Sequence, residues 1–190
     1  MQKNTKGLSE SKVIMDGEGM KLVIERLGLE LLENYGDFEN TVIIGLQPRG
    51  IQFSVRLADY LSKTLGKPIF QGKLDITFHR DDFRRGNEVL VPNSTQIDFL
   101  VEGKNVILVD DVLFTGRSVR AGLDALLAFG RPAEVKLLVL IDRKYGRDLP
   151  LQADFVGKEV DTVSGQKVKV EWSDDASNDR VILYTKQTNE

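Results

Sequence analysis

The sequence predicts an α/β domain in which a central parallel sheet is flanked by helices. Three continuous apolar runs, at 41–46, 105–109 and 135–141, have the length and composition of strands that are buried on both faces. Amphipathic helical patterns lie around and between these runs, and strands that alternate with helices form right-handed βαβ units. The chain of 190 residues is long enough to bury a core as one domain, residues 1–190.

Three helices are predicted from apolar residues that recur at helical spacing. The first covers 20–34, and its main apolar face consists of Met20, Val23, Ile24, Leu27 and Leu31. This face is widened by Leu22, Leu29 and Leu32. We therefore expect the first helix to be buried on two sides, one of them in a subunit interface. The second helix covers 51–65 and the third about 119–129, and a Gly followed two residues later by a Pro ends each of them.

Other segments lie outside this βαβ pattern. Residues 1–18 are polar and are expected to form an N-terminal arm, without the apolar stretch of a signal peptide. Residues 69–78 alternate weakly and predict another strand, and the charged segment 79–94 predicts a loop. From about residue 153 to 190, short strands separated by turns predict a small hood or flap over the sheet.

Composition excludes several kinds of site. The chain has no cysteine and a single histidine, His79, which excludes disulfides, thiolate nucleophiles, Cys-based zinc sites and sites that need two His ligands. No apolar run approaches the roughly 18 residues of a membrane span, so we expect a cytoplasmic protein that does not contact a membrane. The net charge of −3 means that nucleic-acid binding would require a local basic patch.

The strongest local signal is a buried strand that delivers two acids and then a turn opening into a helix. The acids are Asp110 and Asp111, and the turn consists of Val112, Leu113, Phe114, Thr115, Gly116, Arg117 and Ser118. Backbone N–H groups in such a turn, with the helix N-terminus behind them, form an anion site. Two adjacent carboxylates can accept hydrogen bonds from neighbouring sugar hydroxyls, so together these features indicate a ribose 5-phosphate site. The alternative is that Ser118 caps the helix while both acids are solvated turn residues.

This segment resembles the phosphoribosyl pyrophosphate (PRPP) loop of type I phosphoribosyltransferases. Over about 41–168 the chain is similar to one branch of that family, the bacterial pyrimidine operon attenuators that are also uracil phosphoribosyltransferases. The branch is indicated by 109–122 and by four shorter motifs, Asp75-Ile76-Thr77, Arg80-Asp81-Asp82, Gly130-Arg131-Pro132 and Ala153-Asp154-Phe155-Val156-Gly157-Lys158. The resemblance implies the type I phosphoribosyltransferase fold, a central parallel sheet with a hood.

The resemblance also implies roles for individual residues. The turn from Thr115 to Ser118 would hold the 5-phosphate, and Asp110 and Asp111 the ribose hydroxyls, with Asp111 also a candidate general base. The pyrophosphate would be bound by the turn that contains Pro48, Arg49 and Gly50. Residues 76–85 correspond to a flexible catalytic loop whose Arg80 reaches the pyrophosphate as the loop closes. The alternatives are an ordinary strand–helix connection for the first of these two segments and a solvated charged surface loop for the second.

The implied reaction converts uracil and PRPP into UMP and pyrophosphate, with Mg²⁺ bound mainly through the substrate oxygens. The base side would include Arg143, Phe155, Val156 and Val168, for which plain core packing is the alternative. A homodimer or higher homo-oligomer is implied as well.

The same family binds pyrimidine-operon mRNA, and here the sequence departs from its pattern. The Thr and His expected on the first helix align with Glu25 and Leu29, and an expected Arg aligns with Gln152. Arg147 and Lys158 remain, in a region where 143–147 is about one residue longer than in the family. Glu25 would repel phosphate and Leu29 cannot donate a hydrogen bond. The sequence thus predicts an intact enzyme site and a damaged RNA surface, with a nucleotide-sensing RNA regulator or a purine phosphoribosyltransferase as alternatives.

Overall fold

The computed structural model describes residues 8–81, 93–163 and 165–186. The elements follow one another in the order β1 (Leu8–Met15), α1 (Gly17–Tyr35), β2 (Thr41–Leu46), α2 (Gly50–Leu65), β3 (Gln71–Leu74), β4 (Asn105–Leu113), α3 (Arg117–Leu126), β5 (Glu134–Arg143), β6 (Phe155–Val160), β7 (Gln166–Glu171) and β8 (Arg180–Lys186). Short 3-10 helices occur at Thr77–His79, Leu127–Phe129 and Ala176–Asn178. No helix among the described residues has the length and apolar character needed to cross a membrane.

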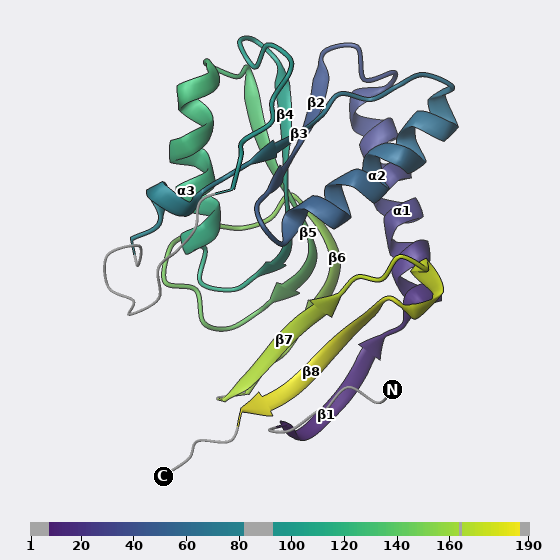
Figure 1. The fold of residues 1–190 in the computed structure, drawn as a ribbon, viewed down its shortest axis with the longest axis vertical. Helices are drawn as coiled ribbons and strands as arrows, with labels where there is room; N and C mark the ends of the chain where they lie inside the picture. The colour runs from purple at the N-terminus through teal and green to yellow at the C-terminus, as the bar shows by residue number, and fades with distance from the viewer. Residues whose placement is uncertain (1–7, 82–92, 164, 187–190) are drawn as a thin grey trace.

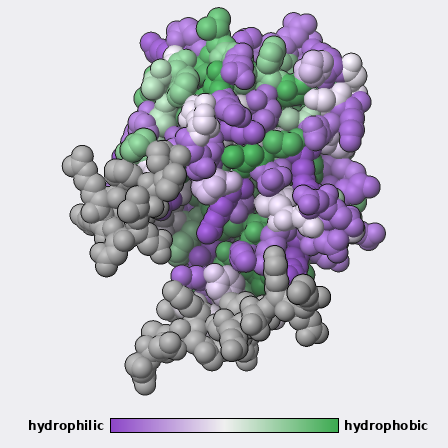
Figure 2. Space-filling model, viewed as in Figure 1, coloured by the Kyte–Doolittle hydropathy of each residue, from purple (hydrophilic) through white to green (hydrophobic). Residues whose placement is uncertain are grey.

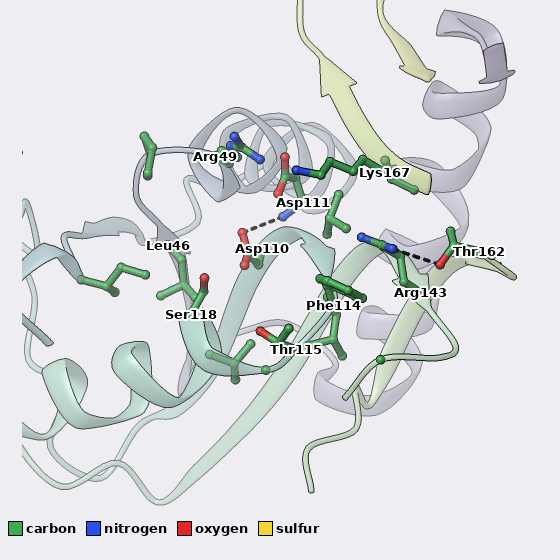
Figure 3. A pocket seen from close by; sticks show the side chains of 18 of the residues that line it. Leu46, Arg49, Asp110, Asp111, Phe114, Thr115, Ser118, Arg143, Thr162 and Lys167 are labelled. Carbon is green, nitrogen blue, oxygen red and sulfur yellow. Dashed lines mark hydrogen bonds between the residues drawn. The ribbon is translucent and has the colours of Figure 1, made fainter. Parts of the chain in front are cut away.

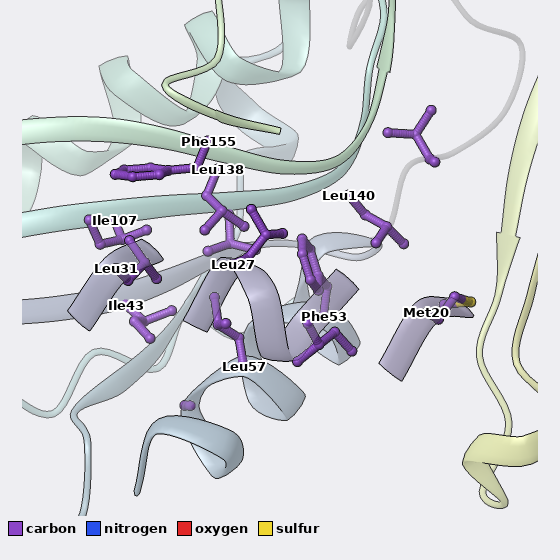
Figure 4. Close-up of a cluster of buried hydrophobic side chains, with 14 of the residues drawn as sticks. Met20, Leu27, Leu31, Ile43, Phe53, Leu57, Ile107, Leu138, Leu140 and Phe155 are labelled. Atoms are coloured by element: carbon purple, nitrogen blue, oxygen red, sulfur yellow. The ribbon is translucent and has the colours of Figure 1, made fainter. Parts of the chain in front are cut away.

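A parallel five-stranded sheet in the order β3-β2-β4-β5-β6 forms the centre of the molecule, as the alternating pattern predicts. Helices α1 and α2 cover one face of this sheet and α3 covers the other (Figure 1). Alternate residues of each strand point to opposite faces. Ile43, Ile107 and Leu138 therefore pack in the core beneath α1 and α2, which Figure 4 shows. Their neighbours Ile44, Leu108 and others pack with α3 in a second core.

The hood is a separate antiparallel sheet in the order β1-β8-β7, and its composition differs from the expectation. Part of the expected N-terminal arm, Leu8–Met15, is a hood strand because it pairs with β8. Part of the expected hood, Phe155–Val160, is instead the edge strand of the main sheet because it pairs in parallel with β5. Residues from the two ends of the chain thus meet beside the carboxyl ends of the main strands (Figure 1).

Two predicted strands differ from the observed ones in ways that affect the site. β4 extends four residues beyond the predicted 105–109, so that Asp110 and Asp111 lie within the strand, as do Val112 and Leu113, which were expected in the turn. The strand predicted over 69–78 is limited to Gln71–Leu74. It ends because the carboxylate of Asp75 accepts hydrogen bonds from the backbone N–H groups of Thr77 (3.1 Å) and Asn93 (3.0 Å), which turn the chain.

The first helix buries one face within the chain and not two. Its inner face includes Met20, Leu27 and Leu31, while Leu22 is 65% exposed and Leu29 is 52% exposed. No other part of the described chain buries the second apolar side of α1 that the sequence predicts. Hydrophilic side chains dominate the face of the molecule shown in Figure 2, with smaller apolar areas between them.

The hood is attached to α2 through a compact cluster of aromatic and charged side chains. Trp172, which directly follows β7, stacks on Phe53 of α2 with ring centroids 6.1 Å apart. The guanidinium of Arg56 lies 5.0 Å from the centre of the Trp172 ring and pairs with the buried carboxylate of Asp179. A buried pair of this kind holds its two segments together because separating either partner would leave a charge unpaired.

Candidate active site

A cavity of about 1450 Å³ lies between the carboxyl ends of the main strands and the hood. The strand ends of β2, β4 and β5 provide one side, and residues of β7 and β8 provide the other. Ligands of open α/β sheets bind at this edge of the sheet. Figure 3 shows residues from both sides of this cavity.

The acid pair lies at the bottom of this cavity. Asp110 and Asp111 are only 7% and 4% exposed, and the backbone N–H of Asp111 donates to the Asp110 carboxylate at 2.9 Å. Burial raises the pKa of Asp110 well above its usual range, and the charge of Asp111 raises that pKa further. Burial also raises the pKa of Asp111, although the positive charge of Arg49 opposes this shift. Two buried carboxylates side by side favour a ligand that brings hydrogen-bond donors or positive charge.

These raised pKa values imply a stability cost that depends on pH. A carboxyl whose pKa is higher in the folded state contributes stability that is complete below its unfolded pKa and is lost as pH rises through the folded value. Asp110→Asn keeps an oxygen that can accept from the Asp111 N–H but removes one charge. We therefore expect Asp110→Asn to raise the Tm of the ligand-free protein at neutral pH, with the gain disappearing near pH ~4. Thermal unfolding of both proteins between about pH 4 and 8 checks this, and a variant Tm that is no higher at neutral pH would contradict it.

The turn after β4 leads directly into α3 and faces the same cavity. Gly116 occupies the N-cap position with φ of 87°, a left-handed conformation that glycine adopts without strain. It offers no side chain to cap the helix, so the alternative in which Ser118 is the cap does not apply. Thr115, Gly116 and Ser118 all line the cavity. Backbone N–H groups at such a helix N-terminus bind anions, and phosphate in particular.

The turn after β2 approaches the acid pair from α2. Pro48 and Arg49 line the cavity, and the Gln47–Pro48 peptide bond is cis. Gly50 packs so tightly against β4 that a Cβ placed there would lie 2.3 Å from the carbonyl oxygen of Val109. Arg49 extends toward Asp111 in Figure 3. The structure thus places a guanidinium and a second strand-end turn on the opposite side of the acids from Thr115.

The predicted catalytic loop is described only as far as Asp81. Arg80 lines the cavity together with Ile76 and Thr77. Asp81 pairs with Arg117, the first residue of α3. The rest of that segment, 82–85, lies outside the described residues. His79 is exposed and does not line the cavity.

The base side of the cavity contains Arg143 and Val168 but not the other two predicted residues. Arg143 is buried, donates to the Thr162 hydroxyl (3.1 Å) and the carbonyl of Gln166 (2.9 Å), and stacks over the Phe114 ring with its guanidinium carbon 3.6 Å from the ring centre. Burial lowers the pKa of Arg143. Phe155 packs in the core beneath α1, and neither it nor its neighbour Val156 lines the cavity, because both belong to an edge strand of the main sheet.

Several lining residues were missed by sequence reasoning. Thr162, Lys167 and Tyr184 come from the hood and the segment that leads to it. Figure 3 shows Lys167 extending from β7 toward Asp111. The alternation of β7 could have indicated that some of its side chains face the main sheet, but nothing local shows that the strand folds back over the acids.

Comparison with known proteins identifies the family. Residues 11–175 match the family model described as the phosphoribosyl transferase domain. The chain belongs to the phosphoribosyltransferase family. It is 46% identical over 172 residues to a protein of Desulfosudis oleivorans named "Bifunctional protein PyrR", covering 90% of this chain and 95% of that one. A protein of the same name from Bacillus cereus is 40% identical over 182 residues, covering 94% of this chain and all of that one.

Solved structures share the phosphoribosyltransferase fold. A hypoxanthine phosphoribosyl transferase of Trypanosoma cruzi superimposes with a TM-score of 0.68 at 17% identity, covering 97% of this chain and 95% of that one. A hypoxanthine-guanine phosphoribosyltransferase of Bacillus anthracis gives a TM-score of 0.61 at 20% identity, covering 78% of this chain and 83% of that one. At these identities the likeness concerns the fold alone.

Proposed function

We propose that this phosphoribosyltransferase forms UMP and pyrophosphate from uracil and PRPP. The observation that carries the proposal is the meeting, in one cavity, of the buried acid pair, the uncapped turn at the start of α3 and the Arg49 turn at the start of α2. PRPP has a matching part for each feature: its two ribose hydroxyls for the acid pair, its 5-phosphate for the turn at α3 and its pyrophosphate for the turn at α2. The relatives named "Bifunctional protein PyrR" support uracil as the base, since the attenuator branch that the sequence resembles has that activity.

Each part of the site has a defined role in this reaction. The N–H groups and hydroxyls at Thr115, Gly116 and Ser118 hold the 5-phosphate and fix the ribose. Asp110 and Asp111 accept hydrogen bonds from the ribose hydroxyls and stabilise positive charge that develops on the sugar as the pyrophosphate leaves. Asp111 is also a candidate to accept a proton from the base.

The pyrophosphate end is bound by a different set of groups. The guanidinium of Arg49 and the N–H groups at the start of α2 bind the leaving pyrophosphate. Arg80 also lines the cavity, and by the resemblance it would reach the pyrophosphate as the catalytic loop closes. Closing that loop would exclude water, which competes with uracil for the reactive sugar.

Magnesium fits this site as an ion carried by the substrate. Among the residues that the structure describes, no group of three or more His, Asp or Glu side chains could hold a metal by itself. The carboxylates of Asp110 and Asp111 open onto the cavity and are oxygen donors of the kind that Mg²⁺ prefers. PRPP would supply most of the remaining oxygens, and the ion would then neutralise charge on the leaving pyrophosphate.

A competition assay with three bases tests the proposal. The protein is incubated with PRPP, Mg²⁺ and radiolabelled uracil, hypoxanthine or guanine, and the nucleotide products are separated. We expect UMP to form and the two purine nucleotides to form much more slowly. Preferential use of a purine would overturn the choice of base while retaining the family. Binding of UMP without turnover of any base would indicate a nucleotide sensor in place of an enzyme.

The proposal does not extend to RNA binding at the level implied for the attenuator branch. The carboxylate of Glu25 lies 3.9 Å from the ammonium of Lys21 and partly neutralises its charge. Leu29 is exposed at the position expected to hold a His. Lys158 donates to the backbone carbonyl of Ile14 at 3.0 Å. The Thr, His and Arg expected at positions 25, 29 and 152 are thus replaced, and Lys158 is engaged within the chain.

We therefore expect no tight, UMP-dependent shift of pyrimidine-leader RNA by this protein. The double variant Glu25→Thr/Leu29→His restores the branch pattern on α1 and is expected to strengthen RNA binding, because it removes a negative charge and adds two hydrogen-bonding side chains. Gel-shift titrations of both proteins, with and without UMP, measure this. Tight binding by the unaltered protein would show that other residues form the RNA surface.

The exposed leucines of α1 support a homodimer or higher homo-oligomer as part of the proposal. Leu22 and Leu29 lie one turn either side of Glu25 on the outward side of the helix. Apolar side chains exposed together are typical of protein interfaces. We also propose a cytoplasmic location, because PRPP and free bases occur together there.

A further inference from the structure

The segment between β5 and β6, residues 144–154, packs along residues 113–118, the end of β4 and the start of α3, here called the phosphate turn because it is proposed to hold the 5-phosphate. This β5–β6 segment includes the stretch that is about one residue longer than the family pattern. One glycine on each stretch fixes how closely the two approach: a Cβ at Gly146 of the segment would lie 2.5 Å from the Phe114 ring, and a Cβ at Gly116 of the turn would lie 3.1 Å from the Leu151 side chain. The two stretches therefore form one packed unit.

Arg147 is the centre of this unit. Its side chain is 20% exposed, and its guanidinium donates inward to four backbone carbonyls and one carboxylate. Two of the carbonyls belong to the phosphate turn, Leu113 at 3.2 Å and Phe114. The carboxylate is that of Asp142, which is buried at the end of β5. A planar guanidinium with five donors can serve so many acceptors at once, whereas an ammonium has three donors.

The next carbonyl of the turn is held by the same segment. The carbonyl of Thr115 accepts from the backbone N–H groups of Asp148 (3.0 Å) and Leu149 (3.2 Å). Three successive carbonyls, those of residues 113–115, are thus bonded to the β5–β6 segment. In a trans peptide the N–H points opposite to the carbonyl, so the N–H groups of Phe114, Thr115 and Gly116 point away from that segment. These three residues line the cavity on their other side.

We infer that Arg147 is a positioning residue for the phosphate turn, which keeps the carbonyls away from the ligand so that the N–H groups face the 5-phosphate. This inference rests on the proposed function, because the phosphate is that of PRPP or UMP. Arg147 itself lines no part of the cavity and acts through Leu113, Phe114 and Asp142. A carbonyl turned toward a phosphate would repel it, so loss of this arrangement should weaken phosphate binding directly.

A purely structural role for Arg147 would have a different consequence. It would lower stability and affect both ends of the active site alike. The positioning role predicts damage at the 5-phosphate end only, because the groups that accept from the Arg147 guanidinium belong to residues 113–114, 142–143 and 151. None of them belongs to the turn with Pro48 and Arg49 that is proposed to bind the pyrophosphate.

The test compares Arg147→Gln and Arg147→Lys with Arg120→Gln in the full-length protein. Arg120 is exposed on α3 and pairs with Asp124, so its variant removes the same charge without touching the turn. Binding of UMP, ribose 5-phosphate and pyrophosphate is measured by calorimetry, and kcat and KM for PRPP by turnover. For Arg147→Gln we expect UMP binding to weaken and the KM for PRPP to rise by roughly 10- to 100-fold, as for a misplaced binding group. Arg147→Gln should bind pyrophosphate as tightly as the wild type does, and Arg120→Gln should match the wild type in every measurement. Arg147→Lys should recover part of the loss.

The outcomes separate the two proposals. Wild-type protein that binds neither UMP nor ribose 5-phosphate overturns the proposed function together with this inference. Wild-type binding with an equally tight Arg147→Gln variant, or with equal losses for UMP and pyrophosphate, overturns the inference alone. If circular dichroism shows that Arg147→Gln does not fold, Arg147→Lys takes its place, because it keeps the charge while losing the planar fork that serves five acceptors. That variant should then weaken UMP binding selectively, and unaltered UMP affinity would reject the inference.

Discussion

Asp111→Asn is expected to lower kcat/KM for UMP formation by roughly 100- to 1000-fold, the range associated with loss of a positioned acid or base. The variant keeps the size of the side chain but loses the charge that would balance the developing charge on the ribose. It also loses the candidate base. Stability should not fall, since burial raises the pKa of Asp111 and so makes its charge costly in the ligand-free protein. Steady-state turnover at saturating Mg²⁺ measures the effect, with Tm measured in parallel.

Asp124→Asn provides a matched control for this variant. Asp124 lies on α3, is exposed and pairs with Arg120, so the same chemical change there should leave turnover intact. Wild-type turnover by Asp111→Asn would show that the buried acids do not assist the reaction.

Gly50→Ala is expected to damage the pyrophosphate end of the site and to reduce stability. The added methyl group would meet the Val109 carbonyl oxygen at 2.3 Å and the Asp110 Cα at 3.0 Å, and neither atom can move without displacing β4. The first turn of α2 must shift instead, carrying Arg49 away from the acid pair. We expect the KM for PRPP to rise by about 10- to 100-fold. The free energy of unfolding should fall by about 1–3 kcal/mol, as for other overpacked sites.

Gly19→Ala is the corresponding control, because a methyl group there meets only the side chains of Met15 and Asp16. It lies on α1, and replacing Gly by Ala within a helix is favourable by itself. Pyrophosphate inhibition and urea unfolding of both variants separate the local effect from a general one. Unchanged pyrophosphate affinity in Gly50→Ala would show that the approach of α2 to β4 is not needed for binding.

The parallel sheet and the phosphate turn could be predicted from sequence because their signals are local. The strand at 41–46 coincides with β2, and the second helix differs by one residue from α2. Residues 105–118 are continuous in the chain, so the strand, the two acids and the turn can be predicted from one stretch of sequence. The cavity lined by these residues lies where an open parallel sheet should bind a ligand.

The hood and the base side could not be predicted in the same way, because they depend on pairing between distant segments. β1 and β8 come from opposite ends of the chain, and nothing in either segment specifies the other. Phe155 and Val156 were associated with the base side by resemblance, yet their strand pairs with β5 and buries them away from the cavity. The role of Arg147 could not be predicted either. Some of its partners are 4 or 5 residues away, but the two carbonyls that link it to the phosphate turn are 33 and 34 residues away.

The attachment of the hood to α2 provides an intrinsic fluorescence probe of hood movement. Trp172 is the single tryptophan of the chain, and its indole stacks on Phe53 beside the guanidinium of Arg56. Indole emission depends on the polarity and charge around the ring, so any displacement of the hood from α2 changes the spectrum. Because Trp172 directly follows β7, the strand that carries the Lys167 and Val168 side of the cavity, emission can follow in real time how that side responds as nucleotide enters and leaves.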